Sequence, residues 1–158
     1  MVMASTTDNP SQPDQPLSRL DDILARYSHT HVIFLDDKGA TNTTDILNIM
    51  DANGGPEHFV WKEYRGGNRA AQARARGYKA WGFFYPDDAQ SVFDDNMAKY
   101  DFLGQQYDAT QAQFDMMIAT GKPVIGHIIS TVAQRDMALA KGAHGIMTTK
   151  PRQTFPYY

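Results

Sequence analysis

Six short apolar runs recur along the chain at a nearly regular spacing, and this spacing limits the fold more than any other feature. They lie 20 to 27 residues apart and begin at His31, His58, Tyr78, Phe102, Val124 and His144. The stretches between them carry apolar residues at helical spacing, and several of these stretches end in a glycine. Strands that alternate with helices in this way are joined by right-handed crossovers and form a parallel sheet. The sequence therefore predicts an α/β fold with about six βα units.

The boundaries of these units follow from the same pattern. We expect strands over residues 31–35, 58–64, 78–85, 102–107, 124–129 and 144–148. We expect helices over residues 18–27, 46–52, 68–76, 89–100, 110–119 and 132–141, with Thr43-Thr44-Asp45 as a cap before the second. The tail, residues 150–158, is expected to cross one end of the fold.

Length and composition predict one ordered domain. The segment 1–16 lacks an apolar core and is rich in Ser, Thr, Asp, Gln and Pro, so we expect a disordered lead-in followed by a single domain over residues 17–158. The lead-in is no signal peptide, and the sequence assigns no compartment beyond a soluble globular protein.

Composition also excludes several classes of function. No apolar run approaches the ~20 residues of a membrane span. The net charge of −3 gives no basic surface for nucleic acid. The chain has no cysteine, which excludes thiolate metal sites and a cysteine nucleophile.

Six βα units are compatible with two architectures. One is an open doubly wound sheet, and the other is an eight-stranded barrel that lacks two strands. Gly54-Gly55 and Gly66-Gly67 lack the spacing of a nucleotide-binding loop. Polar residues cluster at the carboxyl ends of the expected strands, where barrel active sites lie, and this favours the barrel only slightly.

Three segments resemble one family of barrel enzymes. Residues 142–151 read G-A-H-G-I-M-T-T-K-P and are similar to the closing motif of glycerophosphodiester phosphodiesterases, G-V-D-G-I-I-T-D-x-P. The strand end Leu35-Asp36-Asp37-Lys38 resembles the E-I-K of that family and the D-L-K of the related sphingomyelinases D. Residues 16–24 resemble the P-x-L-x-E-x-L helix of the family. His144 and Thr149 depart from the pattern, since the family has Asp at both positions.

The resemblance implies an incomplete (β/α) TIM barrel, with about six of eight βα units. The family's first two strands carry H-R-G, and E-x-D followed by H-D, which supply the catalytic histidines and two metal-binding carboxylates. None of these motifs occurs in this sequence. We therefore expect a member of a metal-dependent phosphodiester hydrolase family, with a glycerophosphodiester or lysolipid ligand, that is inactive as this chain alone. No catalytic residue is assigned.

Three charged side chains are the candidate site residues. Asp36 and Lys38 are two residues apart at a strand end, so their side chains are expected on one face, and Lys62 lies late in the next strand. The resemblance implies that Asp36 binds a divalent metal ion, Mg²⁺ or Ca²⁺, and that Lys38 contacts phosphate. Lys62 is expected to add positive charge for the phosphate. The alternative interpretation is an exposed ion pair of Asp36 and Lys38 at a loop edge, with Lys62 extending to solvent at the rim of the fold.

Other side chains are weaker candidates. His127 is expected to face the pocket or to be a buried structural histidine, and Glu63 is expected on the surface. Tyr64, Tyr85 and Tyr107 lie near strand ends, where they could line a pocket for an alcohol or a lipid headgroup.

Two further functions remain open from sequence alone. A barrel that lacks two strands has two unpaired edges and an open apolar interior, so a non-catalytic interaction protein that self-associates through these edges is the main alternative. An open-sheet domain with an unrelated binding role is the other, and it predicts that Asp36, Lys38 and Lys62 do not converge.

Overall fold

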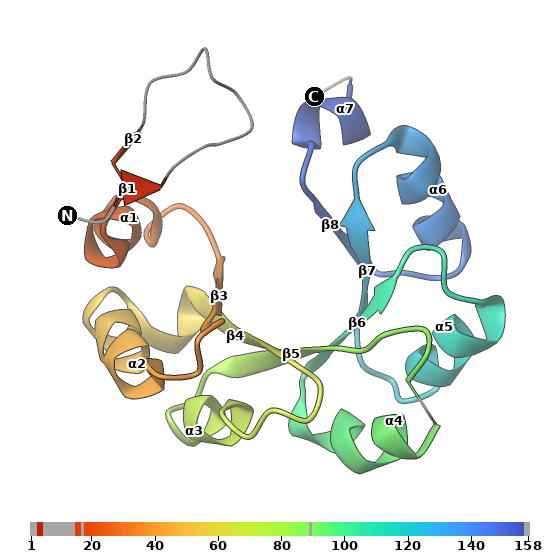
Figure 1. Ribbon diagram of the computed structural model, residues 1–158, viewed down its shortest axis with the longest axis horizontal. Helices are drawn as coiled ribbons and strands as arrows, with labels where there is room; N and C mark the ends of the chain where they lie inside the picture. The colour runs from red at the N-terminus through yellow and green to blue at the C-terminus, as the bar shows by residue number, and fades with distance from the viewer. Residues whose placement is uncertain (1–2, 5–14, 17, 89, 157–158) are drawn as a thin grey trace.

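The computed structural model describes residues 3–4, 15–16, 18–88 and 90–156, and its centre is a six-stranded parallel sheet. Each strand pairs with the next one in the sequence, in the order β3-β4-β5-β6-β7-β8. The strands curve around one side of a common axis, and the helices lie outside them (Figure 1). This is a half-barrel, so the barrel interpretation is confirmed and the open doubly wound sheet is wrong. The strands are β3 (Ile33–Asp36), β4 (Phe59–Tyr64), β5 (Lys79–Phe83), β6 (Phe102–Gln106), β7 (Val124–Ile129) and β8 (Gly145–Thr148).

Helices fill the connections between the strands. Two short 3₁₀ turns, η1 (Gly55–Glu57) and η2 (Met97–Lys99), precede β4 and β6. The α-helices are α1 (Leu20–Tyr27), α2 (Thr43–Ala52), α3 (Ala70–Ala75), α4 (Gln90–Asn96), α5 (Gln111–Ile118), α6 (Val132–Ala140) and α7 (Pro151–Thr154). None of the helices in the described ranges is long and apolar enough to cross a membrane.

Each expected strand and helix is present among the described residues, but most of their ends are shifted by a few residues. The first helix starts at Leu20, two residues later than expected, and its N-cap Arg19 makes no side-chain cap. Thr43 begins α2 itself, and its hydroxyl donates a hydrogen bond to Asp37 Oδ2 (3.0 Å). The tail forms the short helix α7.

Part of the expected lead-in is ordered into a small antiparallel pair, β1 (Met3–Ala4) with β2 (Gln15–Pro16). The rest of residues 1–16 lies outside the described residues, so the expectation of disorder stays a prediction.

Alternation along β4 shows how the sheet divides its side chains between two environments. Phe59, Trp61 and Glu63 point outward and are buried beneath the helices. Lys62 and Tyr64 point to the concave side, where they line a pocket. The apolar core therefore lies between the sheet and the helices, and the concave face is free to carry a site.

Candidate anion-binding pocket

The concave face of the half-barrel holds a pocket of about 680 Å³. Its lining includes the carboxyl ends of β3, β4 and β5, and we call this end of the pocket its mouth. Its wall combines charged side chains with several aromatic rings, which is the usual composition of a site for a polar organic ligand. The lining residues are Phe34, Asp36, Asp37, Lys38, Lys62, Tyr64, Arg69, Trp81, Phe83, Tyr85, Ile125, His127, Ile128, Ile146 and Met147.

Asp36, Lys38 and Lys62 meet at the mouth of this pocket. Asp36 Oδ2 lies 2.5 Å from Lys62 Nζ and 2.7 Å from Lys38 Nζ. The Lys62 side chain is only 11% exposed, whereas that of Lys38 is 83% exposed. Burial of the Asp36 carboxyl group favours a higher pKa, but the hydrogen bonds from Lys38 and Lys62 outweigh it and hold the pKa below its usual value. Asp36 is therefore a charged partner for both lysines.

Strand register explains this convergence. β3 and β4 are parallel, and Asp36 lies directly beside Lys62 in the ladder. Lys38 follows β3 in a turn, and its side chain reaches back to the same carboxylate. The turn is fixed by Asp37, whose carboxylate accepts hydrogen bonds from the Asn42 backbone NH (3.2 Å) and the Thr43 hydroxyl. The structure thus brings together the three residues that the sequence singled out, while their roles toward a metal and a phosphate stay predictions.

The expected metal ion fits poorly among the residues at this mouth. The Asp36 carboxylate is in contact with two ammonium groups, those of Lys38 and Lys62. The Asp37 carboxylate is buried and accepts a hydrogen bond from the backbone NH of Asn42. Over residues 18–88 and 90–156, no three His, Asp or Glu side chains gather closely enough to bind a metal ion. Divalent cations such as Mg²⁺ and Ca²⁺ need several oxygen ligands, so this donor set alone does not make their site.

His127 does face the pocket, from the middle of β7. Its ring centroid lies 4.2 Å from that of Phe83 and 6.0 Å from that of Trp81. Burial, with the positive charges of Lys62 and Lys38, lowers the pKa of His127 to about 4. The imidazole is therefore neutral at pH 7. Its Nδ1 and the indole Nε1 of Trp81 are buried without a hydrogen-bond partner among the described residues.

The other histidines lie away from the pocket lining and fit structural roles. His29 and His58 pack edge to face, with ring centroids 6.3 Å apart, and His31 packs in the same way on Tyr27. His144 accepts a hydrogen bond from the Val124 backbone NH at 3.1 Å.

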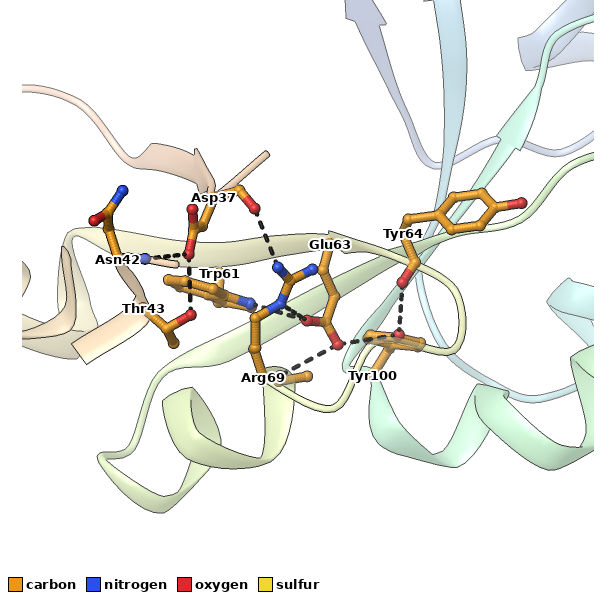
Figure 2. A network of polar contacts seen from close by, with 9 residues as sticks. Asp37, Asn42, Thr43, Trp61, Glu63, Tyr64, Arg69 and Tyr100 are labelled. Atoms are coloured by element: carbon orange, nitrogen blue, oxygen red, sulfur yellow. Dashed lines mark hydrogen bonds and ion pairs between the residues drawn. The ribbon is translucent and has the colours of Figure 1, made fainter. Parts of the chain in front are cut away.

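The sequence placed Glu63 on the surface, and this expectation is wrong, because its side chain is completely buried. Figure 2 shows the polar network around its carboxylate. Its carboxylate accepts hydrogen bonds from Trp61 Nε1 (3.4 Å), Arg69 Nε (3.3 Å), the Ala70 backbone NH (3.2 Å) and the Tyr100 hydroxyl (3.3 Å). Four donors compensate for the loss of water around the charge. The carboxylate thereby joins β4 to the start of α3 and to the segment that precedes β6.

Arg69 connects this buried network to the pocket mouth. Its Nη1 donates a hydrogen bond to the Asp37 backbone oxygen at 3.2 Å (Figure 2). Its side chain also lines the pocket. The Glu63–Arg69 pair therefore supports the turn that follows Asp36. The sequence analysis did not predict this pair. One signal for it was present, since Glu63 shares its strand face with Phe59 and Trp61, and both of these side chains are buried.

Aromatic rings form one side of the pocket. Tyr85 lies beside Tyr64 and Phe83, with centroid distances of 5.0 and 4.9 Å. Tyr107 was expected with them, but that expectation is wrong. Its hydroxyl accepts a hydrogen bond from Gln134 Nε2 (3.0 Å), and Tyr107 is not among the lining residues.

Comparison with known proteins supports the fold. No protein-family model and no curated protein matches the sequence. Among solved structures, it is similar to a protein from Agrobacterium tumefaciens assigned as a glycerophosphoryl diester phosphodiesterase (TM-score 0.72, 15% identity, 90% of this chain and 64% of that one). A protein from Silicibacter pomeroyi with the same assignment gives a TM-score of 0.68 at 12% identity, over 86% of this chain and 53% of that one.

A barrel with a different assignment is also similar. The tryptophan synthase α-subunit of Pyrococcus furiosus gives a TM-score of 0.59 at 11% identity, over 81% of this chain and 60% of that one. This chain spans between about half and two thirds of the length of each of these proteins. At such identities the likeness concerns the fold alone. The chain has the fold of an incomplete (β/α) TIM barrel, and the solved structures that share it include glycerophosphoryl diester phosphodiesterases.

Proposed function

We propose that this chain is a phosphodiesterase-type barrel whose concave pocket binds the phosphate group of an organic phosphodiester, such as a glycerophosphodiester or a lysolipid. The observation that carries the proposal is the convergence of Asp36, Lys38 and Lys62 at one pocket mouth. Two ammonium groups against one carboxylate leave excess positive charge, which suits a phosphate anion.

The remainder of the pocket suits the organic part of such a ligand. Tyr64, Phe83 and Tyr85 provide ring faces and edges next to the charged mouth. Pockets of a few hundred Å³ that combine a few charged groups with aromatic walls hold small organic molecules. The likeness to phosphodiesterase barrels supports the same ligand class.

We further propose that this chain binds the phosphodiester without cleaving it. General acid–base cleavage needs groups that exchange protons near neutral pH. The only imidazole among the described pocket residues is that of His127, and its pKa of about 4 makes it a weak base and leaves it unprotonated at pH 7. The H-R-G and H-D motifs of the family do not occur in the sequence.

Titration calorimetry of the 158-residue chain with glycerophosphocholine tests the binding, with glycerol as the uncharged control. We expect binding of the phosphodiester only, and a loss of at least about tenfold in affinity for Lys38→Gln. Lys79→Gln is the matched control, since Lys79 begins β5, is exposed and pairs with Asp101 (3.5 Å). Equal affinities of the Lys38→Gln variant and the native chain would contradict the proposal.

Release of choline from the same ligand, measured with and without Mg²⁺ or Ca²⁺, tests the second part. We expect no release above a protein-free blank. Metal-stimulated release that the Asp36→Asn variant lacks would refute it.

A self-associating interaction protein is the second candidate. Within the described residues, the edge strands β3 and β8 of the sheet each pair with a single neighbour, and Phe34 on β3 is 42% exposed. Unpaired strand edges beside apolar surface favour pairing with another chain. Sedimentation velocity over a range of concentrations checks this, and a monomer throughout would exclude it.

A further inference from the structure

We infer that Lys62 occupies the place of a divalent cation against Asp36, so that the pocket binds its anionic ligand without a metal ion. The inference rests on the proposed phosphodiester binding and adds how the charge of the phosphate is neutralised. The side chains at the mouth do not supply the ligands that the expected metal ion needs.

The Asp36–Lys62 contact is built into the fold. The two residues are direct partners in the β3–β4 ladder, and Lys62 Nζ lies 2.5 Å from Asp36 Oδ2. Because the Lys62 side chain is 11% exposed, its ammonium group needs a nearby counter-charge, and Asp36 is the carboxylate that contacts it. The ammonium group also lies 5.3 Å from the ring centroid of Trp81, a distance at which the ring attracts a cation.

The charges around Asp36 disfavour a metal ion in addition to this pair. A divalent cation bound to Asp36 would stand close to two ammonium groups, those of Lys38 and Lys62, and would be repelled by both. The neighbouring carboxylates cannot compensate, because Asp37 is bonded within its turn and Glu63 within the buried network. A phosphate anion, in contrast to a metal cation, is attracted by both ammonium groups.

Calorimetry on the native chain provides the direct test. Glycerophosphocholine is titrated once in EDTA and once in excess Mg²⁺ or Ca²⁺, and each metal is also titrated alone. We expect the same affinity for the phosphodiester in both conditions, and no metal binding that depends on Asp36, with Asp36→Asn as the comparison. Lys62→Gln is expected to lower the affinity at least about tenfold, while Lys62→Arg, which keeps the charge, retains most of it.

The outcomes separate the two proposals. Phosphodiester binding that requires a metal, or metal binding that Asp36→Asn abolishes, would overturn this inference and leave the proposed function standing. An absence of phosphodiester binding in both conditions would overturn the proposed function instead. Circular dichroism of the Lys62 variants shows whether they are folded, so that a loss of affinity can be attributed to the lost charge. An unaltered affinity of a folded Lys62→Gln variant would also overturn the inference.

Discussion

The indole ring of Trp81 lies directly against Gly104 on the neighbouring strand. A Cβ atom added at Gly104 would stand 2.5 Å from Trp81 Nε1 and 2.9 Å from Cε2. Trp81 is only 2% exposed and forms part of the pocket floor, so the ring has little room to retreat. The position of the Trp81 ring therefore depends on the absence of a side chain at residue 104 of β6.

Gly104→Ala is expected to lower the free energy of unfolding by about 1–3 kcal/mol, because the added methyl group overpacks the contact with Trp81. Urea denaturation measures the change, and tryptophan fluorescence reports the displacement of the ring. Gly145→Ala on β8 is the matched control, since a Cβ there meets no atom within 4 Å and should change stability by less than about 0.5 kcal/mol. Equal midpoints for the two variants would rule out this packing argument.

Glu63→Gln is expected to destabilise the fold by about 3 kcal/mol, because it removes the charge that pairs with Arg69 and places an amide donor among four existing donors. Glu57→Gln makes the same chemical change at an exposed position and should cost almost nothing. Urea midpoints of the two variants give the comparison. A midpoint for Glu63→Gln as high as that of Glu57→Gln would show that the buried charge is dispensable.

Acidification is expected to weaken the fold through His127. Its pKa is about 4 in the folded chain and 6.5 for the ordinary side chain, so between these values the unfolded chain holds more protons than the folded one. The free energy of unfolding therefore rises with pH through this window, and the stability is lost as the pH falls from 6.5 towards 4. The loss is on the order of 1 kcal/mol, because solvent around the part-buried ring screens the effect.

The contribution of this residue can be isolated by comparing the native chain with His127→Gln, which does not titrate. The difference between their urea-unfolding free energies should shrink or change sign below pH 6.5, whereas the carboxyl groups common to both cancel. NMR titration of the imidazole gives the pKa directly, and a midpoint near 6.5 would contradict the expected burial.

Hydrogen exchange is expected to differ between the edges and the centre of the sheet. In the part of the chain that the structure describes, β3 and β8 each pair with a single neighbour, whereas β5 pairs with β4 and β6. Backbone amides of β5 should therefore exchange more slowly than those of the two edge strands, because fewer bonds hold an edge strand in place. Mass spectrometry resolves these segments. Equal protection of all six strands would indicate that something covers the edges.

Much of the fold was predictable because strand spacing and parallel pairing are set by short-range patterns. Once β3 and β4 are recognised as neighbouring parallel strands, Asp36 and Lys62 have to lie close together at the same end. The direct ion pair between them was not predictable, since it depends on the orientation of two flexible side chains. This ion pair engages the carboxylate to which the resemblance assigned a metal ion.

The missed features depend on contacts that are distant in sequence. Glu63 accepts a hydrogen bond from Tyr100, which is 37 residues away, and Arg69 donates one to Asp37, which is 32 residues away. Tyr107 was misplaced because β6 ends at Gln106, so alternation along the strand no longer fixes the direction of the next side chain. In each case a pattern within one element cannot say which distant group will supply the partner.

The consecutive pairing of β3 to β8 also affects how this domain can form and change. Every strand needs only the strand just before or after it, so the βα units can dock one at a time in the order of synthesis without any segment being threaded between others. A unit gained at the β3 or β8 edge would extend the sheet and leave the existing ladder pairs intact. New units could therefore be added at either edge of the sheet, while the cluster of Asp36, Lys38 and Lys62, which lies on β3, the turn after it and β4, would stay intact.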